Sequence, residues 1–155
     1  MSLTPRGVLL HSKILLIYLI NKIVYTIFTY TINNIIKNPN SRRHFLTLWD
    51  HHDLPDEKLS PQENVKNGKQ ALANCHGSAI QFYVEGDTLH LSHYQRSCDV
   101  FLGGKFNIAS YAILLKMVSE VCNLKSGKMY FDIGDAHIYK NHLEQVKEFL
   151  SREIK

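Results

Sequence analysis

Long apolar stretches alternate with polar, turn-forming segments along the chain. The first stretch, residues 8–36, carries Lys13 and Lys22, whereas a membrane-spanning helix needs about 20 residues almost free of charge. We therefore expect a helix packed in a soluble core, with a membrane anchor as the alternative. Residues 37–41 contain Pro39 between two asparagines, which predicts a turn because proline cannot continue a helix.

The next segment predicts a strand and then a polar loop. Residues 43–49 are rich in strand-forming side chains. Residues 51–70 are polar and contain prolines and a glycine, which is typical of a surface loop. Within this loop, Ser60 can cap a short helix that starts at Pro61, with Glu63 completing a capping box.

The apolar run from residue 78 to residue 95 predicts a β-hairpin. Residues 78–85 and 88–95 both resemble strands. They flank Gly86-Asp87, a pair that favours a tight turn between antiparallel strands. We interpret the histidines of this region, His90 and His93, as residues on the faces of a strand.

The second half of the chain predicts two helices and one more strand. Residues 106–122 are apolar around nearly the whole helical circumference, which indicates a buried helix. Residues 126–127 should turn the chain into a strand over 129–133, which residues 134–135 should end. Residues 141–152 place their apolar side chains on one stripe and predict a last helix. Strands and helices that do not strictly alternate indicate an α+β fold.

Composition narrows the function classes. The 155 residues are 45% hydrophobic, enough for one domain with a core. A net charge of +4 suits an anionic ligand but is too small for a DNA-binding surface. Three cysteines without Cys-x-x-Cys spacing (Cys75, Cys98 and Cys122) favour reduced thiols in the cytosol. The nine histidines form no His-Glu-x-x-His pattern, so we expect no metal site.

Several short motifs have little meaning singly. A free cysteine such as Cys75 is more often a small buried hydrophobe than a nucleophile, and Arg96 alone would be a surface charge. In combination they are specific, because they occur in one order along the chain. The motifs are Ser41-Arg42-Arg43, Cys75-His76 followed by Gln81-Phe82-Tyr83-Val84, YQRSCDVFLG at 94–103, FNIASYA at 106–112, and GDAHIY at 134–139 with Asn141-His142.

This set of motifs resembles the thymidylate synthase family over about residues 33–152. The resemblance implies an α+β fold in which a mixed sheet packs with a buried central helix, incomplete at both ends. It implies reductive methylation of dUMP to dTMP, in which Cys75 adds to C6 of uracil and C5 attacks 5,10-methylenetetrahydrofolate. The folate also supplies the hydride, so neither a metal nor a nicotinamide is needed. The resemblance places Arg96 beside Cys75, where a cation favours the thiolate.

The resemblance also assigns the ligand-binding residues. Arg96 and Ser97 would bind the phosphate, together with Arg42 and Arg43 of the partner subunit of a homodimer. Asn107 would read the pyrimidine edge and favours uracil over cytosine. The remaining pocket residues are His137 and Tyr139 for the sugar 3′-hydroxyl, Asp99 and Gly103 for folate, and Gln95 and His76 for the pocket wall; Asp99 also orders the base site.

The chain departs from the family in its ends and at two internal positions. Residues 1–32 do not resemble the family, so we divide the chain into an apolar N-terminal segment of 1–32 and a partial catalytic region of 33–155. An altered reading frame near the start is one explanation. Ala73-Asn74 and Lys105 stand where the family usually has proline.

We expect a truncated, weakly active or inactive cytoplasmic enzyme without a membrane or DNA partner. The alternatives are a related pyrimidine hydroxymethylase and a non-catalytic fragment that binds the nucleotide or dimerises.

Overall fold

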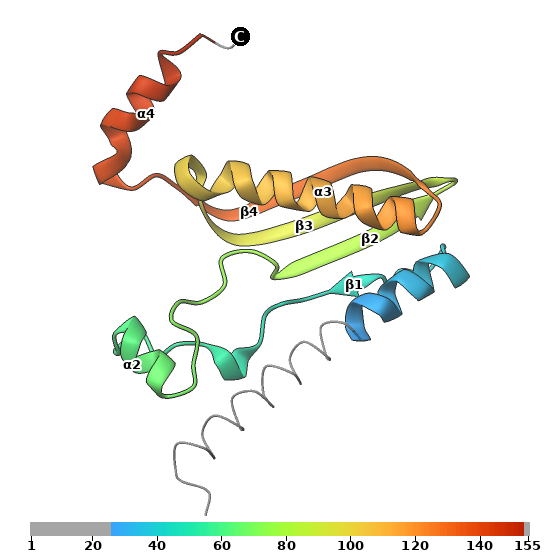
Figure 1. The fold of residues 1–155 in the computed structure, drawn as a ribbon, viewed down its shortest axis with the longest axis horizontal. Helices are drawn as coiled ribbons and strands as arrows, with labels where there is room; N and C mark the ends of the chain where they lie inside the picture. Colours follow the sequence, from blue (N-terminus) through green and yellow to red (C-terminus); the bar gives the residue numbers. More distant parts are fainter. Residues whose placement is uncertain (1–25, 154–155) are drawn as a thin grey trace, which may run out of the picture.

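The computed structural model describes residues 26–153, and the first part of the predicted N-terminal helix, up to residue 25, lies outside them (Figure 1). A helix covers residues 26–37 and is followed by the expected turn, in which the Ser41 amide donates to the Asn38 carbonyl. The other helices are α2 (Pro61–Lys66), α3 (Lys105–Val121) and α4 (Leu143–Leu150). The strands are β1 (Phe45–Leu46), β2 (Ala79–Glu85), β3 (Thr88–Asp99) and β4 (Lys125–His137).

The strands form one mixed sheet in the order β1-β2-β3-β4. The β1–β2 and β2–β3 pairs are antiparallel, whereas β3 and β4 run parallel. Helix α3 connects the parallel pair and lies along them (Figure 1). The predicted α+β fold is therefore confirmed.

Local sequence signals place the hairpin and α2 correctly. Glu85 pairs with Thr88, so Gly86-Asp87 forms a two-residue turn, and Gly86 has the positive φ of 61° that such a turn requires. The Ser60 side chain accepts from the Glu63 amide, and the Glu63 carboxylate accepts from the Ser60 amide, which is the predicted capping box.

The strand predicted over 43–49 is shorter in the structure. Only Phe45–Leu46 pairs as β1, because the following residues bond to the chain just before β2 instead. The Leu48 amide donates to the Gly77 carbonyl, and the Thr47 hydroxyl donates to the Ser78 carbonyl. This bonding ties the end of β1 to the loop that contains Cys75.

The boundaries predicted for the last strand are wrong. Strand β4 runs from Lys125 to His137, and the two glycines expected in turns lie inside it. A Cβ on Gly127 would lie 2.7 Å from His90 Nδ1, and one on Gly134 would lie 2.5 Å from the Tyr94 hydroxyl. Glycine is needed at both positions because side chains of β3 cross over β4 there.

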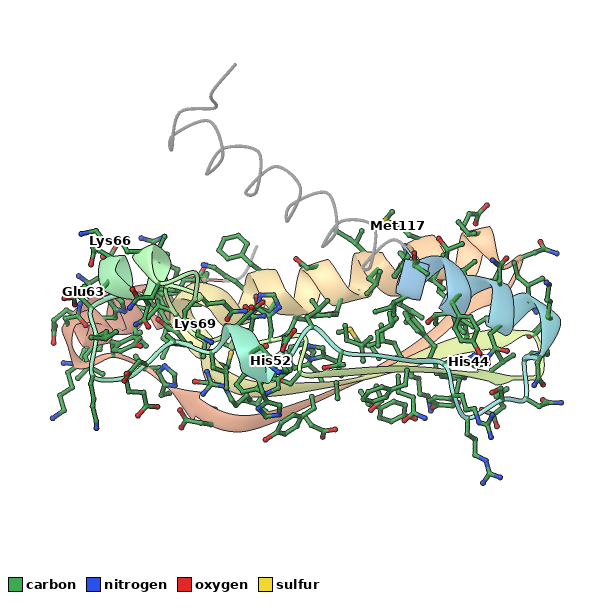
Figure 2. The ribbon with its side chains drawn as sticks, turned by 90° about the horizontal axis from the view of Figure 1, so that it is seen from below. His44, His52, Glu63, Lys66, Lys69 and Met117 are labelled. Carbon is green, nitrogen blue, oxygen red and sulfur yellow. The ribbon has the colours of Figure 1, made fainter. Side chains whose placement is uncertain are left out.

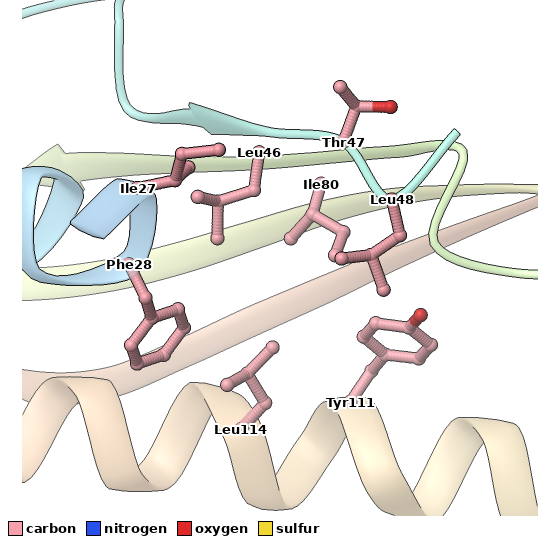
Figure 3. A pocket seen from close by; sticks show the side chains of 8 residues that line it. All are labelled: Ile27, Phe28, Leu46, Thr47, Leu48, Ile80, Tyr111 and Leu114. Atoms are coloured by element: carbon pink, nitrogen blue, oxygen red, sulfur yellow. The ribbon is translucent and has the colours of Figure 1, made fainter. Parts of the chain in front are cut away.

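The helix of residues 26–37 and α3 cover the same face of the sheet, and the core lies between these layers (Figure 3). The buried apolar residues are Ile35, Leu46, Ile80, Phe82, Leu89, Leu91, Tyr111, Leu115 and Val118. An apolar cavity of about 170 Å³ remains between the two helices and β1, with Phe28 and Leu114 in its wall (Figure 3).

Helix α3 buries one side only in the part of the chain that the structure describes. Tyr111, Leu115 and Val118 face the sheet, whereas Ile113 and Met117 are about 60% exposed. Figure 2 shows Met117 on the side of α3 away from the sheet. The expectation that this helix is buried around its circumference is therefore wrong for its outer side. No helix within residues 26–153 is long and apolar enough to cross a membrane.

Candidate nucleotide-binding site

The loop that carries Cys75 lies beside the end of β1 and the C-terminal part of β3. Cys75 is exposed, and its carbonyl accepts from the Ser97 amide at 3.3 Å. The Asn74 side chain donates to the Leu48 carbonyl, and the Asn74 carbonyl accepts from Arg96 Nε at 3.3 Å. Hydrogen bonds from β3 thus hold the loop at Asn74 and at Cys75, the predicted nucleophile.

A line of polar side chains continues from β3 to its neighbours. The Asn107 side-chain amide donates to Gln95 Oε1 at 3.3 Å. The Gln95 side-chain amide donates to the Ser97 backbone carbonyl at 2.8 Å. The Ser97 hydroxyl lies 3.5 Å from Asp135 Oδ2, which accepts from His137 Nδ1 at 3.0 Å. We call these five residues the polar line.

The sheet register explains why these residues meet. In the parallel β3–β4 pair, Ser97 is opposite Asp135 and Asp99 is opposite His137. Alternate residues of a strand share a face, so Gln95, Ser97 and Asp99 recur on one side of β3. The β3 and β4 members of the polar line therefore follow from an every-second-residue pattern on two adjacent strands, and Asn107 joins them from α3 through Gln95.

The other predicted residues surround this line. The Asp99 carboxylate accepts from the amides of Phe101 and Leu102, so it holds the turn between β3 and α3. A Cβ placed on Gly103 in this turn would lie 3.8 Å from the Asn107 amide. Tyr139 contacts the His137 ring edge to face, with centroids 5.1 Å apart.

Arg42 and Arg43 lie away from the polar line in the same chain. They border a polar surface hollow with Tyr30 and Asn34, and the neighbouring His44 lies towards one end of the sheet (Figure 2). The His44 carbonyl bonds to Phe82, which pairs with Leu91 on β3. From Leu91 to Arg96 a strand rises about 17 Å, so the backbone of Arg42 and Arg43 lies far along the sheet from Arg96.

Three residues of the site were missed from the sequence. Asp135 joins Ser97 to His137, and its position two residues before His137 on a strand would have indicated a shared face. Tyr111 contacts His76, with its hydroxyl 3.0 Å from Nδ1. His93, interpreted as an ordinary strand residue, is fully buried, and its Nε2 accepts from the Gly77 amide at 3.2 Å.

Burial changes the acid–base properties of this inner layer. It lowers the pKa of His93 to about 4, with a smaller contribution from nearby His76. It raises the pKa of Tyr111 to about 12, so this side chain stays a neutral hydroxyl. Burial also raises the pKa of the Cys98 thiol. Within residues 26–153, no three histidine, cysteine or acidic side chains gather as a metal-binding group.

The lowered pKa of His93 predicts a pH dependence of stability. The unfolded chain, with a histidine pKa near 6.5, binds a proton before the folded chain does, so unfolding becomes easier as pH falls from about 6.5 to about 4. We expect His93→Gln to flatten the rise of the unfolding free energy with pH over this window. Urea denaturation at several pH values measures the slope, and an unchanged slope in the variant would contradict the assignment.

The chain is similar to known proteins over most of its length. A family model described as "Thymidylate synthase" matches residues 21–155. A thymidylate synthase of Francisella tularensis subsp. holarctica is 53% identical over 116 residues, which are 75% of this chain and 42% of the relative. One from Francisella philomiragia subsp. philomiragia is 50% identical over 116 residues with the same coverage of both chains.

The chain thus spans 42% of the length of these curated relatives. The domain boundary expected between residues 32 and 33 stays a prediction, as do the individual site residues. The match over residues 21–155, together with the identity to the relatives, shows the family. The chain belongs to the thymidylate synthase family.

Proposed function

We propose that this chain binds dUMP along the polar line and that Cys75 adds to C6 of its uracil ring. The observation that carries this proposal is the connection of the Cys75 loop to the polar line through the Ser97 amide. Near the C-terminal end of β3, the Cys75 thiol would thus stand with the Asn107 amide and with the hydroxyl, carboxylate and imidazole groups of Ser97, Asp135 and His137. The reaction is the methylation of dUMP to dTMP with 5,10-methylenetetrahydrofolate.

Asn107 would read the base because Gln95 fixes its orientation. One N–H of the Asn107 amide donates to Gln95 Oε1. The second N–H and the amide oxygen stay available, and they complement a uracil carbonyl and the ring N3–H. A cytosine offers neither of these groups in the same positions, so the pair favours uracil.

Arg96 and Ser97 would hold the phosphate. Only Nε of Arg96 bonds to Asn74, and the guanidinium lies 5.6 Å from the Trp49 ring centre. The terminal N–H groups of Arg96 can therefore pair with a phosphate dianion. Arg42 and Arg43 lie at the far part of the sheet, which suits their donation from the partner subunit of a homodimer.

His137 and Tyr139 would bind the sugar 3′-hydroxyl. A carboxylate only accepts hydrogen bonds, so His137 presents its Nδ1–H to Asp135. This fixes Nε2 as the free nitrogen, and in neutral imidazole it can accept from the hydroxyl. His76 and Gln95 would complete the pocket wall.

Two residues of this chain are assigned to folate. Asp99 and Gly103 lie in the turn before α3 and would contribute to folate binding. This chain spans only part of its relatives, and we propose that on its own, in the cytoplasm, it binds dUMP with weak or no turnover. If Cys75 does not react with dUMP, the alternative function is that of a non-catalytic fragment that binds the nucleotide or dimerises.

The test separates the thiol step from complete turnover. Addition of Cys75 to C6 makes C5 a carbon nucleophile, which takes up deuterium from D₂O without folate. We expect loss of the H5 signal of dUMP in ¹H NMR with the purified chain, and little dTMP when methylenetetrahydrofolate is added. Binding of dUMP without any H5 exchange would favour the non-catalytic fragment. Turnover similar to that of complete relatives would contradict weak activity.

Asn107→Asp is expected to change base preference. The carboxylate cannot donate to a uracil carbonyl, but it can accept from the cytosine amino group. We expect dUMP affinity to fall by about 10- to 100-fold, consistent with about 1–3 kcal/mol for a lost paired contact, while dCMP affinity rises. Isothermal titration with both nucleotides measures this. Equal loss of both affinities would show that Asn107 supports the fold rather than the base. A hydroxymethyl product at C5 would favour the hydroxymethylase alternative.

A further inference from the structure

The Cys75 loop has no proline to stiffen it, yet four consecutive residues are individually held. The Asn74 carbonyl accepts from Arg96, and the Cys75 carbonyl accepts from the Ser97 amide. His76 pairs with the Tyr111 hydroxyl, and the Gly77 amide donates to His93. The first two contacts come from residues of the polar line or next to it, whereas the last two come from residues with no assigned role.

His93 is an unusual choice for its place in the core. It is 0% exposed, stacks on Phe131 with ring centres 4.7 Å apart, and contacts the tilted ring of Tyr111 with ring centres 3.7 Å apart. Its Nδ1 is buried without a hydrogen-bond partner in the described part of the chain. Leaving a polar atom unpaired costs free energy that an apolar ring of similar size would not cost. The acceptor at Nε2 is therefore what distinguishes histidine here.

The residue that His93 holds is Gly77, which lies two residues after the proposed nucleophile Cys75. Gly77 has φ of 75°, and a Cβ there would lie 2.8 Å from Leu48 Cδ1. The Gly77 carbonyl accepts from the Leu48 amide. Figure 3 shows Tyr111 reaching from α3 towards Leu48. His93 and Leu48 thus bind the two polar backbone groups of Gly77.

We propose that His93 is a positioning residue for Cys75, acting through Gly77 directly and through the Tyr111–His76 contact. This inference rests on the proposed function, because the position it sets is that of the sulfur against C6 of dUMP. The His93–Tyr111 pair replaces the backbone stiffness that Ala73-Asn74 lacks. A shift of about 1 Å at a reacting atom can cost about 100-fold in rate.

The hydrogen bond itself can be tested without any ligand. Because Nε2 accepts from the Gly77 N–H, neutral His93 must carry its proton on Nδ1. We expect ¹⁵N NMR at pH 7 to show this tautomer, and the Gly77 amide to exchange slowly with solvent. In His93→Phe, exchange of the Gly77 amide should become at least tenfold faster. A proton on Nε2, or an unchanged Gly77 exchange rate in the variant, would overturn the proposal.

The reaction provides the second test, with a matched control on the same strand. His90 also accepts a backbone N–H, from Lys128 to its Nδ1 at 3.0 Å, and stacks on Tyr83, but it lies away from the Cys75 loop. His93→Phe should slow dUMP H5 exchange about 100-fold with less than a threefold change in dUMP affinity. His93→Gln, whose amide oxygen can accept from Gly77, should recover at least tenfold of this loss.

The control separates positioning from general destabilisation. His90→Phe should change the melting temperature by about as much as His93→Phe does and yet keep the exchange rate. An equal rate loss in both variants, or no recovery in His93→Gln, would overturn the positioning role. If the wild-type chain shows no H5 exchange, the proposed function fails, whereas the Gly77 amide still decides whether His93 holds the loop.

Discussion

Cys75→Ser is expected to abolish H5 exchange of dUMP, with a rate loss of at least about 1,000-fold. A serine hydroxyl is almost wholly protonated near neutral pH and is a weak nucleophile towards C6, whereas a thiol supplies some thiolate. Binding of dUMP should persist, since the phosphate and base contacts are assigned to Arg96, Ser97 and Asn107. The ¹H NMR exchange assay gives the rate, and isothermal titration gives the affinity.

The fold should tolerate this change because the Cys75 side chain is exposed and its backbone makes the contact with Ser97. Cys122→Ser is the matched control. Cys122 is half-buried at the end of α3, outside the polar line, so its replacement should leave the exchange rate unchanged. Retained exchange in Cys75→Ser would refute the assigned nucleophile, and loss of dUMP binding would show that the substitution disturbs the site as a whole.

The elements that were predictable from the sequence depend on local chemistry. The Gly86-Asp87 turn and the Ser60 capping box each lie within a few residues of the atoms they bind. The extent of β4 depends on residues of another strand. Gly127 and Gly134 read as turns because glycine favours turns, and only the packing of His90 and Tyr94 shows why glycine stands in a strand.

The candidate site shows the same division. The motifs predicted Gln95, Ser97, Asn107 and His137 as site residues, and in the structure hydrogen bonds connect them along the polar line. His93 was not identifiable from the sequence. Its proposed positioning role depends on its burial and on its hydrogen bond to Gly77 in the Cys75 loop, which is distant in sequence. The helix after β3 was expected to be buried on all sides from its composition, but in residues 26–153 the sheet covers one side only.

Gly134→Ala is expected to have the second large effect, because it pushes β4 away from β3 beside the polar line. The new Cβ would lie 2.5 Å from the Tyr94 hydroxyl and 2.9 Å from the Arg96 carbonyl. The tyrosine can rotate away, but the backbone carbonyl can yield only if the strand moves. We expect a loss of about 1–3 kcal/mol of unfolding free energy, typical of an overpacked site, measured by urea denaturation.

The neighbouring Ser97–Asp135 pair makes this substitution functional as well as structural. Asp135 follows Gly134, and a shift of β4 would lengthen its 3.5 Å contact with Ser97 and turn His137 away from the sugar site. Affinity for dUMP should therefore fall at least about tenfold, consistent with the loss of one charge-assisted hydrogen bond. Gly103→Ala is the control for stability, since among the described residues its Cβ would meet only the Asn107 side-chain amide, at an ordinary 3.8 Å. Equal unfolding free energies of Gly134→Ala and Gly103→Ala would contradict this prediction. They would show that the close approach of β3 and β4 at Gly134 does not hold Asp135 against Ser97.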